Sequence, residues 1–393
     1  MHFRPFFDMQ AFHQIRAGVI GGGFIGPVHM EALRRLGVQV TAIGGSRSCE
    51  ALAKQWGIPH VYPGKEVDGL LQSDQVDVVH ITSPNRYHYS QSLKALEAGK
   101  HVICEKPLAM TTEETRHIRD MARRCKKQIF AVNYNVRFYP AVLQLRDDIA
   151  SGRLGEIIHV NGSYFQDWLL KDTDYNWRLL PKEGGALRAV ADIGTHWMDT
   201  VTFMLGSRIK ELYAHLGTYH KTRQRPVGEV QTFSDDTVTE TKPYRVQTED
   251  FASIMLQFQS GAHGNLAVSQ VASGRKNSIR VEIYGSQQSA WWDSERPNEI
   301  QYGARDESNR VALRNAAGFQ QGVQGFTDYP PGHNEGFPDT FKMLYRAVYH
   351  DILNGPGKQP LYATAEDGHA EVRLCEAVLE SAKSNQWVKI QRK

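Results

Sequence analysis

The chain has 393 residues and a formal net charge of +3, from 46 lysines and arginines against 43 aspartates and glutamates. Hydrophobic residues make up 41% of it and charged residues 23%, which excludes intrinsic disorder, collagen-like repeats and a disulfide-stapled miniprotein. At roughly 100–200 residues per domain the length predicts two domains, and the balanced charge gives no reason to expect a nucleic-acid partner.

Residues 1–14 are expected to form an N-terminal extension, and they lack the charged and apolar segments of a signal peptide. No stretch approaches the roughly 18 apolar residues that a membrane span needs. The four cysteines lie far apart, without the spacing of zinc ligands. We therefore expect a cytoplasmic protein with reduced cysteines, no membrane contact and no metal site.

Residues 15–145 alternate short β-branched segments with amphipathic stretches, which predicts βαβ units around a parallel sheet. Strands are expected at residues 15–20, 39–43, 76–81, 101–104 and 128–132. Helices are expected at residues 27–36, 50–56, 89–98 and 113–125. This α/β half is the expected dinucleotide-binding domain of Rossmann type.

Residues 146–393 follow a different pattern, with alternating apolar and polar residues over 156–165, 209–216, 251–259, 262–269 and 278–284. Polar turns separate these segments, so hairpins explain them better than crossovers and predict an α+β domain with a mostly antiparallel sheet. Segments 219–248 and 294–337 are too polar and too rich in glycine and proline for regular elements, and we expect long loops there. A C-terminal helix over 339–353 is expected to pack back onto one of the domains.

The glycine pattern G-x-G-x-x-G is formed by Gly21, Gly23 and Gly26, with Phe24 and Ile25 between the last two. It follows an expected strand and opens an expected helix, the context in which such glycines bind a dinucleotide pyrophosphate. The alternative is that the glycines only make a tight turn.

The end of the second strand carries no acidic residue, although NAD sites usually place one there to bind the ribose. Ser46 and Arg47 occupy this position instead and are compatible with a 2′-phosphate. Arg47 is equally compatible with a solvated surface position. The sequence therefore predicts NAD or NADP as cofactor, without choosing between them.

Polar residues follow the later strands of this half, where ligands of open α/β sheets bind. Candidate cofactor-binding residues after the strands expected at 76–81, 101–104 and 128–132 are Ser83, Pro84, Asn85, His88, Glu105, Lys106 and Asn133. Lys106 is also the candidate for a catalytic cation, because it would project beside the nicotinamide; a surface charge is the alternative.

Asp192 and His196 lie four residues apart after a glycine pair, so a helix that starts here places both on one face. His196 can exchange a proton near neutral pH, and Asp192 can orient it or accept a substrate hydroxyl. A helix-capping Asp beside a core His is the structural alternative. Further substrate-binding candidates are Gln166, Trp168, Arg178 and His333, of which packing would also explain the Trp.

Three stretches together, residues 18–26, 98–108 and 192–199, resemble the glucose–fructose oxidoreductase and inositol dehydrogenase superfamily, Gfo/Idh/MocA. The resemblance implies a second domain with a large open antiparallel sheet and hydride transfer between NAD(P) and a sugar, sugar derivative or cyclitol. It assigns Lys106 to the family's Glu-Lys-Pro lysine, and Asp192 and His196 to its catalytic pair. It also implies a homodimer or homotetramer.

Two other functions remain open at this point. Some relatives are redox-assisted glycosidases, which oxidise a sugar hydroxyl transiently, eliminate the aglycone and regenerate their cofactor. A glycoside would then be the substrate. A non-catalytic dinucleotide-binding sensor is the second alternative, and it would have no use for Lys106 and His196.

Overall fold

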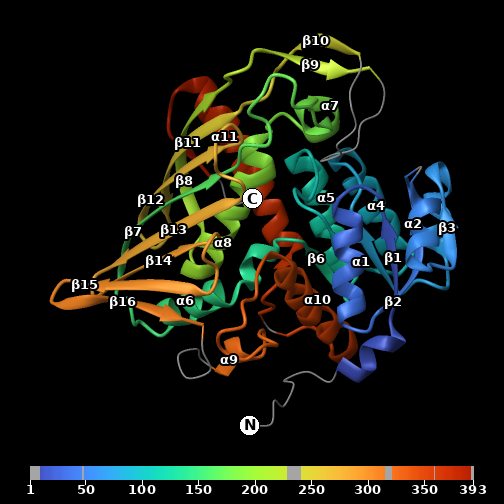
Figure 1. The fold of residues 1–393 in the computed structure, drawn as a ribbon, viewed down its shortest axis with the longest axis horizontal. Helices are drawn as coiled ribbons and strands as arrows, with labels where there is room; N and C mark the ends of the chain where they lie inside the picture. Colours follow the sequence, from blue (N-terminus) through green and yellow to red (C-terminus); the bar gives the residue numbers. More distant parts are fainter. Residues whose placement is uncertain (1–8, 47, 228–239, 315–320, 358, 391–393) are drawn as a thin grey trace. The chain divides into compact units, whose positions relative to one another are not determined.

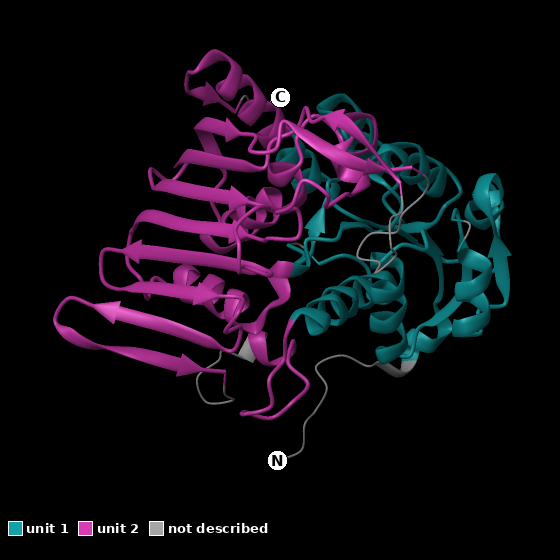
Figure 2. Ribbon diagram, turned by 45° about the horizontal axis from the view of Figure 1, so that its top comes forward, with its two compact units in different colours: residues 1–135, 231–235, 337–372 teal, residues 136–230, 236–336, 373–393 magenta. Residues whose placement is uncertain are grey.

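The structure, a computed structural model, describes residues 9–46, 48–227, 240–314, 321–357 and 359–390. The chain divides into two compact units, which Figure 2 colours separately. The first comprises the described residues of 1–135 and 337–372, and the second those of 136–230, 236–336 and 373–393. Residues 1–8 of the expected extension and the candidate Arg47 lie outside the described residues.

The first unit contains a seven-stranded sheet in the order β17-β6-β5-β4-β1-β2-β3 (Figure 1). Its strands are β1 (Arg16–Ile20), β2 (Gln39–Gly44), β3 (His60–Tyr62), β4 (Val78–Ile81), β5 (His101–Cys104), β6 (Phe130–Val132) and β17 (Ala363–Thr364). All neighbours pair in parallel except β17 with β6. The predicted Rossmann-type parallel sheet is confirmed.

The helices of this unit are α1 (Ile25–Arg35), α2 (Cys49–Trp56), α3 (Val67–Gln72), α4 (Asn85–Glu97), α5 (Thr112–Arg124) and α10 (Phe337–Asn354). Thr111 and Glu114 form a capping box that starts α5. Helix α10 packs on α1, where Arg35 and Asp339 form an ion pair of 2.6 Å. The sequence pattern missed β3 and α3, because both are short and β3 is only half-buried.

The second unit contains a nine-stranded sheet in the order β16-β15-β14-β13-β7-β12-β11-β8-β18. Its strands are β7 (Ile157–Phe165), β8 (Ile209–Gly217), β11 (Phe251–Phe258), β12 (His263–Ser269), β13 (Ser278–Gly285), β14 (Ser289–Asp293), β15 (Glu299–Ala304), β16 (Glu307–Leu313) and β18 (Val388–Lys389). The predicted largely antiparallel sheet is confirmed, with one exception: β7 and β12 are parallel. Hairpins alone therefore do not build this sheet, because β7 lies between β12 and β13.

The two segments expected to be long loops contain regular elements. In 219–248, β9 (Thr222–Pro226) pairs with β10 (Thr241–Arg245). In 294–337, strands β15 and β16 form a hairpin at the sheet edge, and α9 (Gln321–Gln324) follows. The expectation was wrong because β9, β10 and β16 consist mostly of polar residues: β9 and β10 form a separate two-stranded sheet, and β16 is an almost entirely exposed edge strand. In β15 the apolar alternation rests on only two buried residues, Ile300 and Tyr302.

The helices of the second unit are α6 (Pro140–Ala150), α7 (Pro181–Gly184) and α8 (Thr195–Leu205), and α11 (Ala365–Ser384) ends in it. Helices α6 and α8 lie together on one face of the sheet (Figure 1). Trp197 of α8 is buried and donates its indole N–H to the Arg280 carbonyl, 2.8 Å away. Gly162 of β7 lies beneath this indole, so the missing side chain lets α8 approach the sheet closely.

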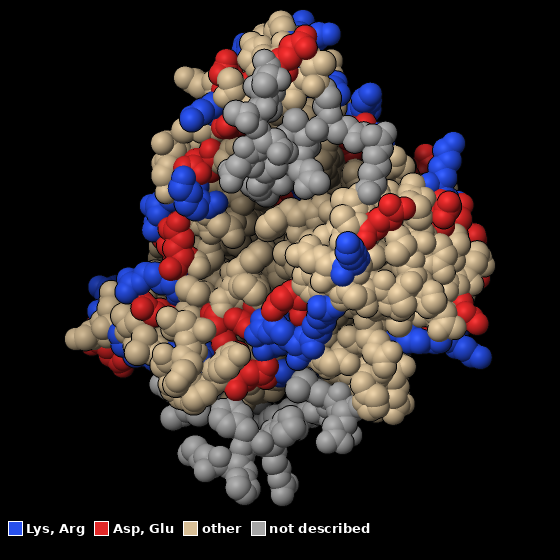
Figure 3. Space-filling view, turned by 45° about the vertical axis from the view of Figure 1, so that its right-hand side comes forward, with Lys and Arg blue, Asp and Glu red and all other residues tan. Residues whose placement is uncertain are grey.

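Charged side chains of both signs lie next to one another on the face shown in Figure 3, without forming separate acidic and basic areas. Among the residues described, no helix has the length and hydrophobicity needed to cross a membrane.

We expect Gly162→Ala to destabilise the second unit. The new Cβ would lie 2.1 Å from the Arg280 carbonyl oxygen and 2.3 Å from the Trp197 indole nitrogen, and backbone cannot yield as a flexible side chain can. Overpacking of this kind costs about 1–3 kcal/mol, and urea unfolding measures it. Gly336→Ala is the control, because a Cβ there meets nothing within 4 Å. Equal unfolding midpoints for the two variants would contradict the close approach.

Candidate active site

The glycine turn lies between β1, which ends at Ile20, and α1, which begins at Ile25. Gly21 has φ of +118°, and a Cβ there would lie 2.7 Å from the Thr82 carbonyl. A Cβ on Gly26 would lie 2.3 Å from the Gly21 carbonyl oxygen. The protein's own packing therefore requires glycine at both positions.

Gly23 differs from these two glycines, because a Cβ there would meet nothing within 4 Å. The packing of the protein does not explain a glycine at this position, whereas the close approach of a ligand's phosphate to the backbone does. Phe24 is 53% exposed beside it, and the N–H groups at the start of α1 favour an anion. The turn fits the pyrophosphate of a dinucleotide.

The turn after β2 carries hydroxyl groups in place of a carboxylate. Ser46 and Ser48 share a hydrogen bond of 3.1 Å between their Oγ atoms, and Ser48 Oγ donates to the Gly22 carbonyl over 3.2 Å. These two serines therefore lie against the glycine turn. No acidic side chain comes from the described residues between Gly44 and Cys49.

The turns after β4 and β5 are joined by His88, a buried residue of α4. Its Nδ1 lies 2.8 Å from the Pro107 carbonyl oxygen and its Nε2 lies 2.8 Å from the Ser83 carbonyl oxygen. Asn85, also buried, begins the same helix after Pro84. Both ring nitrogens of His88 thus contact backbone carbonyl oxygens, so His88 links the two turns that carry candidate cofactor-binding residues.

Glu105 is buried at the end of β5, and Lys106 beside it is half-buried. Asn133 donates its amide N–H to Glu105, and the backbone N–H of Lys106 donates to Glu105 Oε2 over 3.2 Å. Burial alone would raise the pKa of Glu105, but the hydrogen bond from His29 and the charge of Lys106 outweigh it and hold the pKa at about 2. A fixed negative charge therefore lies beside the candidate lysine.

In the second unit, a π-helical turn (Val190–Gly194) carries Asp192 and continues directly into α8, which carries His196. Both side chains are buried. Thr195 donates its hydroxyl to the Ala191 carbonyl over 3.0 Å within this turn. Such π-turns within helices are frequent at functional sites, and this one keeps the Asp and the His on one continuous helix.

The Asp192 carboxylate has a donor on each oxygen. Arg178 Nε lies 3.1 Å from Oδ1, and Gln270 donates its Nε2–H to Oδ2 over 2.8 Å. The structure therefore brings the candidates Arg178 and Asp192 together. It also adds Gln270, which follows β12 and lies 78 residues from Asp192.

A second set of polar groups lies at the end of β7. Its Tyr164 packs against the ring of His196. The Tyr164 ring centroid is 6.2 Å from that of His196, and its hydroxyl donates to Asn277 Oδ1 over 2.7 Å. Gln166 Nε2 donates to the same Asn277 oxygen over 2.9 Å, and Trp168 donates its indole N–H to Gln166 over 2.8 Å. Gln166 and Trp168 therefore belong to one hydrogen-bonded group.

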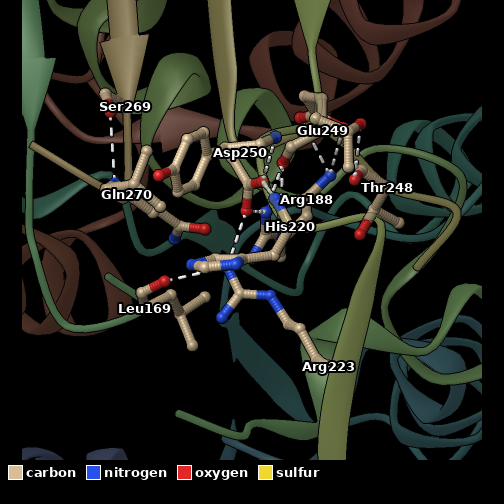
Figure 4. Close-up of polar contacts among 12 residues, drawn as sticks. Leu169, Arg188, His220, Arg223, Thr248, Glu249, Asp250, Ser269 and Gln270 are labelled. Atoms are coloured by element: carbon tan, nitrogen blue, oxygen red, sulfur yellow. Dashed lines mark hydrogen bonds and ion pairs between the residues drawn. The ribbon is translucent and has the colours of Figure 1, made fainter. Parts of the chain in front are cut away.

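Two neighbouring acidic residues before β11 anchor the segment that leads to Asp192 (Figure 4). The buried Glu249 carboxylate accepts the backbone N–H of Arg188 over 3.0 Å and that of Val190 over 2.8 Å. Burial raises the pKa of Glu249, which these N–H donors partly offset. The carboxylate therefore stabilises the N-terminal end of the π-helical turn.

Asp250 holds two buried guanidinium groups (Figure 4). Arg188 donates to its Oδ1, and Arg223 of β9 donates to the same oxygen over 2.8 Å. The other oxygen accepts the backbone N–H of Tyr219 over 2.7 Å. Arg188 and Arg223 lower the pKa of Asp250 against the effect of burial. This network attaches β9 and the Asp192 segment to the sheet.

His333, in contrast, is exposed, and both its backbone groups are bonded: its N–H donates to the Pro330 carbonyl over 3.2 Å, and its carbonyl accepts from Arg314. Gln270, Asn277, Glu249 and Asp250 were missed by sequence reasoning. Their partners lie about 60 to 110 residues away, so no local spacing reveals them.

Comparison with known protein families supports the assignment of both halves. A model described as "Oxidoreductase family, NAD-binding Rossmann fold" matches residues 15–134. A second, described as "GFO/IDH/MocA C-terminal domain", matches residues 142–291.

Similar proteins extend over nearly the whole chain. A levoglucosan dehydrogenase of Pseudarthrobacter phenanthrenivorans is 28% identical over 96% of this chain and 98% of its own length. A levoglucosan dehydrogenase in complex with NADH and levoglucosan has a TM-score of 0.85 at 26% identity, covering 96% of this chain and 100% of the other. An oxidoreductase domain protein from Kribbella flavida has a TM-score of 0.86 at 30% identity, over 96% and 99%.

We expect Glu249→Gln to lower the free energy of unfolding by about 1–3 kcal/mol, because the amide N–H₂ that replaces Oε2 would then face the buried N–H of Arg188, while Oε1 still accepts from Val190. Urea unfolding at pH 7 measures the change. Glu295→Gln is the matched control, since Glu295 pairs with Arg275 in solvent and should change stability by less than about 0.5 kcal/mol. A Glu249→Gln protein as stable as the control would show that the carboxylate does not anchor the turn.

Proposed function

The chain belongs to the Gfo/Idh/MocA family of oxidoreductases, and from this membership we propose that it is an NAD-dependent dehydrogenase of a sugar, sugar derivative or cyclitol. The observation that carries the proposal is the Asp192 arrangement: a buried carboxylate with a donor on each oxygen, one helical turn before a buried histidine. The similarity to a levoglucosan dehydrogenase along nearly the full chain supports the substrate class.

For the cofactor we propose NAD. The open side of Gly23 and the start of α1 suit a pyrophosphate, and NADH is bound in a similar solved structure. Ser46 replaces the usual acidic residue after β2, so NADP use stays within the proposal. Ser83, Pro84, Asn85 and Asn133 are proposed to line the cofactor, with His88 and Glu105 holding their turns in place. When bound, the nicotinamide supplies the hydride acceptor or donor.

We assign the proton transfer to His196 and the charge stabilisation to Lys106. Oxidation of an alcohol carbon requires its hydroxyl proton to leave, and an imidazole accepts a proton near neutral pH. A lysine ammonium that hydrogen-bonds the same oxygen stabilises the developing alkoxide, an effect worth roughly 3–4 kcal/mol. In the reductive direction the same two groups return the proton. This chemistry requires no metal.

Asp192 is proposed to bind a substrate hydroxyl or to orient His196, while Arg178 and Gln270 keep its carboxylate in place. Gln166 and Trp168 offer an amide and an indole face to a sugar ring. His333 is proposed as a further substrate-binding residue, with its side chain exposed.

The quaternary structure is proposed to be a homodimer or homotetramer formed through the second sheet. On β11, Phe251 is 36% and Met255 41% exposed, and Met255 lies opposite Tyr213 of β8. His159 and Tyr284 stack on neighbouring strands with ring centroids 4.4 Å apart.

Sedimentation velocity tests the proposed oligomer. We expect Met255→Asp to lower the sedimentation coefficient, and a wild-type protein that sediments as a monomer would contradict the proposal.

The activity is tested with levoglucosan, L-sorbose, myo-inositol, free hexoses and aryl glucosides, each with NAD and with NADP. We expect absorbance at 340 nm to rise with at least one free sugar or cyclitol and NAD. Release of the aglycone without any net change at 340 nm would instead establish the redox-assisted glycosidase. Absence of both, together with retained dinucleotide binding, would favour the sensor.

We expect Lys106→Ala and His196→Ala each to lower kcat at least 100-fold, because each removes a group proposed to act only on the reacting oxygen. NAD binding, followed by the quenching of protein fluorescence, should change less than threefold for His196→Ala. Lys276→Ala, which removes an exposed lysine paired with Asp167, is the control and should keep wild-type kcat. Unchanged kcat in both test variants would refute the assigned roles.

A further inference from the structure

Four side chains from different elements of the first unit form one continuous line of hydrogen bonds. Glu105 Oε1 lies 3.0 Å from His29 Nε2 of α1. His29 Nδ1 lies 3.0 Å from His80 Nδ1 of β4, and His80 Nε2 lies 2.9 Å from the Tyr349 hydroxyl of α10. We call His29, His80 and Tyr349 the histidine relay. The relay leads away from Glu105, the residue that precedes Lys106.

The histidine relay has no access to solvent, because all three of its residues are 0% exposed. The ring of Tyr345 packs on both imidazoles, with centroids 5.2 Å from His29 and 4.9 Å from His80. Phe341 covers His29 from the same helix, 5.8 Å away. Buried polar groups need partners, so each ring nitrogen here has to be satisfied by its neighbour in the line.

With both imidazoles neutral, these contacts determine where the protons lie. An ionised carboxylate only accepts hydrogen bonds, so His29 carries its proton on Nε2 and donates it to Glu105. In a neutral ring Nδ1 of His29 is then an acceptor, and His80 must donate from its own Nδ1. His80 Nε2 is consequently an acceptor for the Tyr349 O–H.

The opposite direction fails at Glu105. If Tyr349 accepted from His80, then His29 would donate from Nδ1, and its bare Nε2 would face a carboxylate oxygen at 3.0 Å, while the Asn133 amide nitrogen 3.4 Å away already donates to Glu105. Asn133 and the backbone N–H of Lys106 already donate to this carboxylate, which favours its ionised form. A protonated Glu105 would weaken both contacts.

The surroundings of the line favour a neutral His80. Burial and the neighbouring His29 both lower the pKa of His80 well below its usual value. Besides Glu105 and Lys106, the titratable groups that face the line are the hydroxyls of Tyr345 and Tyr349, whose pKa burial raises. The negative charge nearest the far end of the line is Asp77, which also raises the pKa of Tyr349.

We propose that the histidine relay is a positioning device for the reaction: Tyr349 orients His80, His80 fixes the tautomer of His29, and His29 holds Glu105 as an ionised carboxylate beside Lys106. The inference rests on the proposed function for its catalytic consequence, whereas the proton positions stand independently of it. The line ends at a buried tyrosine, so it orients charge and does not conduct protons to solvent.

The proton positions are tested on the full chain labelled with ¹⁵N-histidine, by long-range ¹H–¹⁵N correlation NMR between pH 6 and 8. We expect the Nε2–H tautomer for His29 and the Nδ1–H tautomer for His80, with the His80 ring not titrating; His80→Asn assigns the His80 signals. The opposite tautomers, a doubly protonated His29, or titration of His80 in this range would overturn the proposal. This result does not depend on any substrate.

The catalytic consequence is tested by His80→Leu, which removes the donor to His29 Nδ1. His29 Nδ1 then has no partner, so the ring is no longer held in the Nε2–H tautomer, and Glu105 loses a fixed donor that favours its ionised form. We expect kcat to fall at least fivefold, KM for NAD to stay within twofold, and the acid limb of the kcat–pH profile to move up by at least 0.5. His80→Asn, whose amide N–H can donate in place of Nδ1, should recover most of the activity.

Equal losses in the leucine and asparagine variants, with an unmoved pH profile, would show that His80 only packs the core and would overturn the positioning role. If the wild-type protein oxidises no sugar or cyclitol, the proposed function fails, while the tautomers measured by NMR still decide the histidine relay. The two failures are therefore distinguishable.

Discussion

The burial of ionised carboxylates is the constraint on which both parts of the candidate site depend. A carboxylate away from water is stable only where donors replace its hydration, and those donors then have fixed positions. Glu105 receives His29, Asn133 and the N–H of Lys106. Because one of these donors is the backbone N–H of Lys106, the hydrogen bonds that stabilise Glu105 also fix the turn that carries the candidate lysine.

The second unit also contains buried carboxylates, and different donors stabilise them. Glu249 accepts two backbone N–H groups of the segment before Asp192, and Asp250 neutralises two buried guanidinium groups. These contacts join the π-helical turn to the sheet. Asp192 and His196 thus lie on one continuous helical segment, and Glu249 holds its start.

Local sequence pattern predicted much of the fold and part of the candidate site. The strand–glycine–helix pattern predicted the parallel sheet and its dinucleotide turn, because glycine at φ of +118° and a helix start are local features. Spacing also placed Asp192 and His196 on one helix. It failed for β9, β10 and β16, which consist mostly of polar residues, and for β15, whose alternation rests on only two buried residues, Ile300 and Tyr302.

The sequence by itself determined the two fold classes, the glycine turn and the residue types available for proton and hydride chemistry, since these follow from local pattern. Only the tertiary structure decided that Arg178 and Gln270 hold Asp192, and that His29, His80 and Tyr349 line up behind Glu105. These partners lie as far as 269 residues apart in the chain. Hydrogen bonds act over about 3 Å, so folding must first bring such residues together.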